Sequence, residues 1–117
     1  MKDMQKKEFR PWGFYVVTFE GDGYSTKILH VNPKQQLSVQ SHNHRSEHWT
    51  VVKGQAGILL DGKEYILNKG ESIDIPLKAI HSLKNNTDVD LEVVEVQMGD
   101  ILSENDIVRY KDIYGRV

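Results

Sequence analysis

Apolar and polar residues alternate along most of the chain, in short runs that are separated by turn-forming residues. A period of two is typical of a β-strand with one buried face, and no segment before residue 100 sustains the 3.6-residue period of a helix. Turn signals recur about every eight to twelve residues, which favours a sandwich or barrel. We therefore expect an all-β fold, one small β-barrel, with strands over residues 14–19, 24–31, 37–42, 49–52, 56–60, 64–67, 72–75, 80–84 and 91–97.

The connections between these runs carry residues that permit tight turns. Glycines in the segment 20–23 and the pair Asp61-Gly62 separate neighbouring strands. Because glycine accepts positive φ at no steric cost, both places predict β-hairpins. The sequence shows no linker, repeat or low-complexity segment, so we expect residues 1–117 to form a single domain.

The two ends of the chain differ from the strands between them. Residues 1–9 are polar and charged, which predicts a loose arm. In the tail, residues 100–117, Ser103 is followed by Glu104 and Asp106. A serine before acidic residues is typical of a helix start, so this pattern predicts a short helical turn in a tail that packs on the barrel.

Composition narrows the classes of function. The 117 residues include no cysteine, which excludes disulfides and thiolate zinc sites. Lys and Arg number 15 against 17 Asp and Glu, so the basic surface of a nucleic-acid-binding protein is missing. No apolar run approaches the roughly 18 residues that span a bilayer, and the first residues lack a signal-peptide pattern. We expect a cytoplasmic protein that binds neither nucleic acid nor membrane.

Candidate chemistry is concentrated in residues 40–49, which hold three of the five histidines. Alternation places Gln40 and His42 on one face of one strand and Glu47 on a face of the next. A turn between the strands would bring these side chains together, and His81 is a distant partner. Imidazole and carboxylate groups that converge suggest a divalent metal, and without cysteine the usual ligands are histidine, carboxylate and amide oxygen.

The spacing of these residues resembles the two motifs of the cupins. Gln40 stands where the first histidine of the first motif commonly lies, and Lys78 replaces the usual glycine of the second motif. Both motifs together are far more specific than one His-x-His pair. The resemblance implies a jelly-roll β-barrel, and it is carried by Gln40, His42, Glu47 and Gly54 in the first motif and by Gly70, Pro76, His81 and Asn85 in the second.

Nearly the whole chain is similar to one branch of the cupins, the type II phosphomannose isomerase cupin. In that branch the cupin is often the carboxyl-terminal half of a bifunctional protein with a mannose-1-phosphate guanylyltransferase. This sequence has no nucleotide-binding glycine loop, so it resembles the isomerase half alone. The matching segments are Arg10-Pro-Trp-Gly, Leu37-Ser-Val-Gln, His44-Arg-Ser-Glu-His-Trp, Val51-Val-Lys-Gly, Glu95-Val-Gln, Asp106-Ile-Val-Arg109 and Tyr114-Gly-Arg116.

The resemblance implies that Gln40, His42, Glu47 and His81 hold one divalent metal ion. Two imidazoles, a carboxylate and an amide oxygen suit zinc as first choice, with manganese, iron, cobalt or nickel as alternatives. It also implies a small phosphosugar as partner and the interconversion of mannose 6-phosphate and fructose 6-phosphate. That reaction moves a proton between C2 and C1 through an enediol, so it requires carbonyl polarisation and a base.

Two residues are candidates for the catalytic base, and the sequence does not choose between them. His44 adjoins the metal ligands and titrates near neutrality, although it could also replace Gln40 as a ligand. Glu95 lies on the predicted inner face, where burial would raise its pKa. His48 alternates with Glu47, so we expect it to point out of the barrel.

A sugar phosphate requires cationic partners, for which the sequence offers Lys27, Arg45, Arg109 and Arg116. Arg109 is preferred because it lies in a family motif that is otherwise hard to explain structurally. For Arg109 and Arg116 a salt bridge that pins the tail is an equal alternative.

Two other classes of function stay open at this point. A cupin could bind or sense a small sugar without catalysis, or it could be a metal-dependent oxygenase. The polar inner positions Lys27, Glu95 and Gln97 are not needed by an oxygenase that acts on an apolar compound. We also expect a homodimer, because the segment 14–17 and an apolar tail leave edges to be covered.

Overall fold

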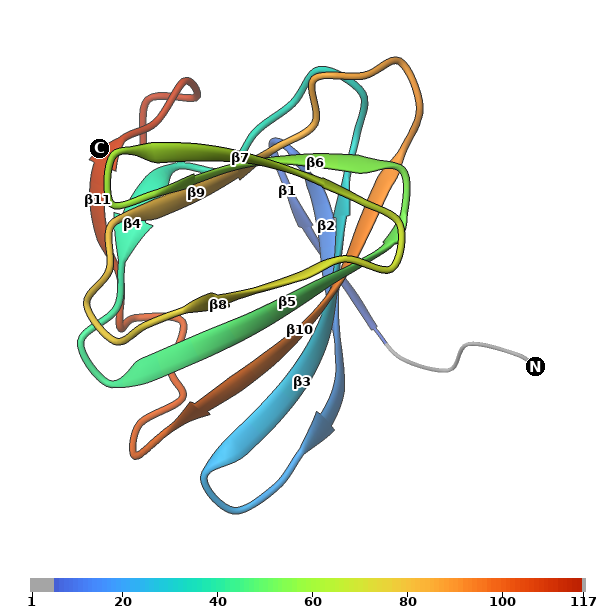
Figure 1. The fold of residues 1–117 in the computed structure, drawn as a ribbon. Coiled ribbons are helices and arrows are strands. Elements are labelled where there is room, and N and C mark those ends of the chain that lie inside the picture. The colour runs from blue at the N-terminus through green and yellow to red at the C-terminus, as the bar shows by residue number, and fades with distance from the viewer. Residues whose placement is uncertain (1–5, 117) are drawn as a thin grey trace.

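The computed structural model describes residues 6–116, in which the regular secondary structure consists of β-strands alone. Two antiparallel sheets face each other (Figure 1), which confirms the predicted all-β fold. The first sheet has the order β1 (Lys7–Arg10), β2 (Gly13–Glu20), β3 (Tyr24–Val31), β10 (Leu91–Gly99), β5 (Arg45–Lys53) and β8 (Ser72–Ile75). The second has the order β11 (Val108–Lys111), β4 (Val39–Ser41), β9 (His81–Lys84), β6 (Gln55–Leu60) and β7 (Lys63–Asn68).

After β3 the chain passes repeatedly from one sheet to the other. Strands β4, β9 and β11 belong to the second sheet, whereas β5, β8 and β10 belong to the first. Figure 1 shows the β4–β5 and β8–β9 connections at the same end of the barrel. Residues that are distant in sequence therefore meet at this end.

Each predicted strand is present, but two further strands were not predicted. Lys7–Phe9, assigned to a loose arm, belongs to β1, which pairs with β2; residues 1–5 of that arm lie outside the described residues. Cross-strand contacts explain the pairing, because Phe9 lies 5.8 Å from Phe14 between ring centroids and the Lys7 ammonium lies 4.6 Å above the Phe14 ring.

The tail also differs from the prediction, since the helical turn at Ser103 is a single tight turn. The Asp106 amide donates to the Ser103 carbonyl oxygen at 3.0 Å, and the chain then enters β11 instead of a helix. The Asp106 carboxylate accepts hydrogen bonds from the amides of Asn43 and His44, both at 2.9 Å. These bonds fix the tail to the β4–β5 connection. Within the described residues, no helix is long and apolar enough to cross a bilayer.

The inner face of the first sheet changes from polar to apolar along its length. On β10, Gln97 and Glu95 are buried at one end, and Val93 and Leu91 are buried at the other. The residues that pair with these positions on β3 and β5 extend the polar half and the apolar half across the sheet. One half of the barrel is consequently a closed apolar core, made by residues such as Val31, Trp49, Val51, Ile58, Ile75, Leu83, Leu91 and Val93, and the other half is a polar pocket.

Two turns adopt left-handed backbone at positions of the cupin motifs. Gly54 has φ of 83°, and a Cβ there would lie 2.5 Å from the Asp90 carbonyl oxygen, so glycine is required. Lys78, which replaces the usual glycine, has φ of 65°, and its amide donates to the His42 carbonyl oxygen at 2.9 Å. The turn is therefore kept without glycine, and it anchors the backbone that carries His42.

Candidate metal centre

Three of the four predicted metal ligands meet inside the barrel. His42 follows β4, Glu47 lies on β5 and His81 begins β9, and each is at most 3% exposed. One ligand atom from each lies within 4.8 Å of the others. Glu47 is in the middle, with Oε2 3.4 Å from His42 Nε2 and Oε1 3.8 Å from His81 Nε2.

Nε2 of each histidine faces Glu47, and the second ring nitrogen, Nδ1, orients the ring. Nδ1 of His42 contacts the Asp106 carbonyl oxygen at 2.7 Å, and Nδ1 of His81 contacts that of Ala79 at 2.9 Å. A carbonyl only accepts, so each Nδ1 donates and each Nε2 keeps its lone pair. Burial lowers the pKa of His42 to about 4, with Arg45 adding to the shift, and burial also lowers the pKa of His81. The imidazoles are therefore neutral at neutral pH, as metal ligands must be.

The chemistry of the donor set fits a divalent metal. Nε2 of His81 is buried and has no hydrogen-bond partner among residues 6–116, which is costly unless another group binds it. Gln40 lines the same pocket opposite His81 in the strand register, and its amide nitrogen donates to Ser38 Oγ at 3.0 Å. The amide oxygen is thus the only Gln40 atom that could complete the set, and its role stays a prediction.

Arg45 lies beside these ligands and is buried. Its Nε donates to Glu47 Oε2 at 2.8 Å, and its Nη2 lies 3.3 Å from His42 Nε2. The guanidinium therefore neutralises the carboxylate that a metal would need. Nη1 reaches the Ser103 carbonyl oxygen at 3.3 Å, which links the centre to the tail.

A second buried carboxylate, Glu95, adjoins the centre. Trp49 Nε1 bridges the two acids, donating to Glu95 Oε2 at 2.9 Å and to Glu47 Oε1 at 3.1 Å. Gln97 donates to Glu95 Oε1 at 2.7 Å. Burial, aided by the charge of Glu47 and only partly offset by Lys27, raises the pKa of Glu95 to about 8. Glu95 can accordingly take up and release a proton near neutral pH.

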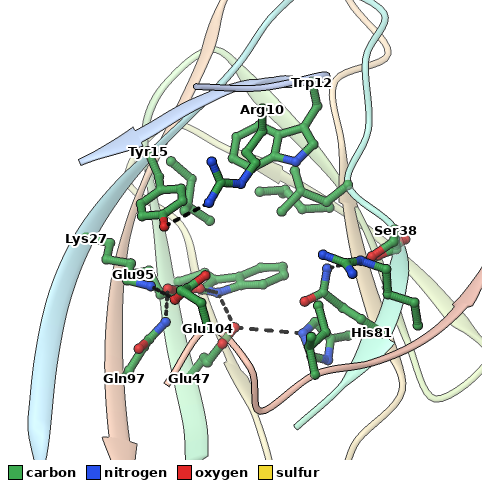
Figure 2. A pocket seen from close by; sticks show the side chains of 18 of the residues that line it. Arg10, Trp12, Tyr15, Lys27, Ser38, Glu47, His81, Glu95, Gln97 and Glu104 are labelled. Carbon is green, nitrogen blue, oxygen red and sulfur yellow. Dashed lines mark hydrogen bonds and ion pairs between the residues drawn. The ribbon is translucent and has the colours of Figure 1, made fainter. Parts of the chain in front are cut away.

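The pocket is closed on its other side by a group of cations around Tyr15. Figure 2 shows Arg10, Tyr15 and Lys27 along this wall, with Glu104 in front of them. Arg10 donates to the Tyr15 hydroxyl at 3.2 Å, and Lys27 forms an ion pair with Glu104. Cationic, acidic and metal-binding groups thus surround one cavity of about 70 Å³.

A model of known proteins, described as the mannose-6-phosphate isomerase C-terminal family, matches residues 1–112. The chain belongs to this family. It is 46% identical over 114 residues to mannose-1-phosphate guanylyltransferase of Escherichia coli K12, covering 97% of the chain and 24% of the relative. It is 43% identical over 108 residues to alginate biosynthesis protein AlgA of Pseudomonas aeruginosa, covering 92% and 22%. The chain therefore spans about a quarter of the length of these relatives.

Solved structures support the cupin fold of the family. The capsular polysaccharide assembling protein CapF from Staphylococcus aureus superposes with a TM-score of 0.83 at 18% identity, over 95% of this chain and 34% of CapF. The Cnp3 cupin domain of Schizosaccharomyces pombe superposes with a TM-score of 0.71 at 11% identity, over 74% and 64%. Identities this low establish the fold alone.

The structure does not bring His44, one of the two candidate bases of this cupin, to the pocket. The residue lies in the turn before β5, where its side chain is 44% exposed and Nδ1 lies 3.5 Å from Asp100 Oδ1. His44 is therefore not placed to exchange a proton with a ligand in the pocket. His48 points outward as predicted, and its Nδ1 lies 2.6 Å from Asp74 Oδ1.

The candidate phosphate ligands fall into two groups. Lys27 and Arg45 lie close to Glu104, whereas Arg109 enters the pocket from β11, opposite Gln40. Nε of Arg109 is buried and has no hydrogen-bond partner in the described part of the chain. Arg116 also lines the pocket, and its Nε donates to Asp112 Oδ2 at 2.7 Å within the tail.

Sequence reasoning missed three residues that line the pocket. Arg10 belongs to a family motif, and Tyr15 alternates with the apolar residues of β2, so both carried a signal that was not used. Glu104 was considered only as part of a helix start. Its position follows no strand period, because the segment between β10 and β11 contains no regular structure.

Proposed function

We propose that this cupin is a metal-dependent aldose-ketose isomerase that interconverts mannose 6-phosphate and fructose 6-phosphate. The observation that carries the proposal is the bridge made by Trp49 between Glu47, at the centre of the candidate metal ligands, and Glu95, whose pKa lies near neutrality. A ligand site and a proton carrier thus share one pocket. Membership of the mannose-6-phosphate isomerase C-terminal family supports the substrate class.

A divalent cation held by His42, Glu47 and His81, with Gln40 as fourth ligand, would supply Lewis-acid polarisation of the sugar carbonyl. The neutral imidazoles and the central carboxylate leave positions for substrate oxygens, as an open site requires. The identity of the metal stays open between zinc and the other candidates.

Glu95 is the base in this proposal. In the forward direction the Glu95 carboxylate takes the C2 proton of the open-chain aldose, and the protonated Glu95 then returns a proton to C1. A hydroxyl proton passes from O2 to O1 in the same reaction. A base whose pKa lies near the working pH serves both directions. Trp49 and Gln97 donate to the two carboxylate oxygens and hold the group in position.

The phosphate group of the substrate would contact cationic side chains of the wall. Lys27 and Arg45 adjoin the inner cavity, and the buried Nε of Arg109 has a donor to offer. Guanidinium groups match phosphate oxygens in charge and geometry. Charge and hydrogen bonding therefore favour a phosphorylated sugar over a neutral one.

A sugar-binding cupin without catalysis is the second candidate. The ion pair between Arg45 and Glu47 favours it, because a guanidinium already neutralises the carboxylate of the ligand set. Turnover separates the candidates, since a non-catalytic cupin would keep the metal and bind or sense the sugar without converting it. An oxygenase is disfavoured by the charged inner wall around Lys27 and Glu95.

The test is an isomerisation assay on protein that has been stripped by a chelator and reloaded separately with zinc, manganese, iron, cobalt or nickel. We expect mannose 6-phosphate to yield fructose 6-phosphate with at least one metal, and Glu47→Gln to lose both metal and turnover. His48→Gln is the matched control, because His48 lies on the outer face. If the protein contains the metal but forms no product with any of the five metals, the isomerase proposal is overturned.

We also propose a homodimer. Phe9 is 70% exposed beside the edge of the first sheet, and Tyr110 and Ile113 are about half exposed on the tail. Apolar groups on unpaired edges favour association. Sedimentation should therefore give twice the 13.5 kDa mass of the chain, and a monomer at micromolar concentration would contradict the proposal.

A further inference from the structure

Two positive side chains adjoin the carboxylate of Glu104, and a third lies nearby. Lys27 forms an ion pair with it, and Nη1 of Arg45 lies 4.0 Å from the same oxygen, Oε2. Arg10 lies on the same wall, since the Lys27 ammonium and the Arg10 guanidinium lie 4.8 and 5.1 Å from the Tyr15 ring centroid (Figure 2). Burial raises the pKa of Glu104, but Lys27, then Arg45 and Arg10, outweigh burial and lower it. Glu104 therefore stays ionised among three cations.

The two partners of the central ion pair differ in exposure. The side chain of Lys27 is 7% exposed, whereas that of Glu104 is 52% exposed. A buried ammonium requires a counter-charge, because leaving it unpaired is strongly destabilising. Glu104 can return to water at small cost, but Lys27 cannot. The carboxylate therefore leaves most readily when another anion takes its place.

Glu104 also lines two cavities. The inner one, beside the candidate metal ligands, has a volume of about 70 Å³, and an outer one has about 310 Å³. Both are lined by Tyr15, Lys27, Gln97 and Glu104. Small-molecule sites usually measure about 300 to 1,000 Å³, so the inner cavity alone is too small for a sugar phosphate. Only Glu104 of these four residues lies outside the strands, so it is the part of the wall that can move with least disruption.

We propose that Lys27, Arg45 and Arg10 form one part of the binding site for the phosphate monoester of the ligand, and that Glu104 occupies this part until the ligand displaces it. A phosphate dianion carries more charge and more acceptor oxygens than a carboxylate, so it replaces Glu104 without leaving Lys27 unpaired. Displacement also joins the two cavities. The proposal rests on the proposed function for the nature of the ligand, but the anion site is testable without turnover.

The experiment measures binding of inorganic phosphate to the purified 117-residue chain by isothermal titration calorimetry at fixed salt. Glu104→Gln removes the competing charge, and we expect about tenfold tighter binding, which is the size of one charge-assisted contact. Asp88→Asn is the matched control. Asp88 is 91% exposed, forms an ion pair with Lys34 and lines neither cavity, so we expect less than about a twofold change.

Substitution of Lys27 completes the test. Lys27→Met should abolish phosphate binding in both the wild-type and the Glu104→Gln backgrounds, whereas Lys27→Arg should retain it, and circular dichroism would verify folding. Equal phosphate affinity of wild type and Glu104→Gln, or an equal gain in Asp88→Asn, would overturn the displacement. Should the proposed isomerisation fail while Glu104→Gln still tightens phosphate binding, the anion site stands and only the catalytic function is lost.

Discussion

Replacing Glu95 by glutamine should change how the stability of the metal-free protein depends on pH. Glu95 is fully buried, and burial together with the charge of Glu47 raises its pKa to about 8 from the ordinary 4.5. Between these values the folded protein holds a proton that the unfolded chain has released. Unfolding therefore releases a proton, and the free energy of unfolding must fall as the pH rises.

The interval from pH 6.5 to 8 shows this effect most clearly. Burial lowers the pKa of His42 to about 4 from 6.5 and also lowers that of His81, so both histidines add stability as the pH rises, mostly below pH 6.5 and by about 0.4 kcal/mol each above it. Glu95 gives a slope of about 1.4 kcal/mol per pH unit in the opposite direction, which halves at pH 8, where the carboxyl is half ionised. Glu95 alone lowers the free energy of unfolding by about 1.5 to 2 kcal/mol over the interval, and the net decrease should be about 1 kcal/mol.

Urea denaturation, followed by tryptophan fluorescence in the presence of a chelator, measures this slope. We expect Glu95→Gln to abolish the slope, whatever its effect on absolute stability. Glu64→Gln removes the same charge on the exposed strand β7, so it should keep the wild-type slope. A wild-type protein whose stability is flat or rises from pH 6.5 to 8 would refute the argument for a protonated Glu95.

Three further predictions follow from the site. His81→Gln should weaken metal binding by at least about 100-fold in a chelator competition assay, because even the outer partners of metal ligands are worth about 10- to 100-fold, and unchanged affinity would exclude His81 as a ligand. Arg109→Ala should raise the KM for mannose 6-phosphate by about 10- to 100-fold, because it removes one charge-assisted phosphate contact, and it should leave the metal content intact. An unchanged KM would count against that contact. Gly54→Ala should lower the denaturation midpoint, since its Cβ would clash with the Asp90 carbonyl oxygen, whereas Gly62→Ala meets no atom within 4 Å and should cost less.

The strands could be predicted because alternation is a local signal. In residues 91–97 every second side chain points to the same face of the strand. Glu95 and Gln97 therefore lie on the buried face of β10 together with Val93. The short edge strands β1 and β11 escaped prediction because each has four residues, of which three are exposed. Their pairing depends on partners elsewhere in the chain, which a local pattern does not contain.

The candidate site was predictable to a similar extent. His42 and Glu47 lie on strands that a short turn joins, so alternation alone brings them together, whereas His81 was found through its motif spacing. The exposed orientation of His44 was not predictable, because a turn has no fixed period. Glu104 was missed for the same reason. Its contact with Lys27 joins residues 77 positions apart, through a segment without regular structure.

The central claim, proton transfer to a phosphosugar beside a metal, is tested most directly by exchange with solvent deuterium. Metal-loaded protein is incubated in D2O with mannose 6-phosphate, and deuterium at C2 of the aldose and C1 of the ketose is measured by NMR. We predict deuterium incorporation together with formation of fructose 6-phosphate, and loss of both in Glu95→Gln with metal retained. Absence of product and of deuterium in the metal-loaded wild type would contradict the account.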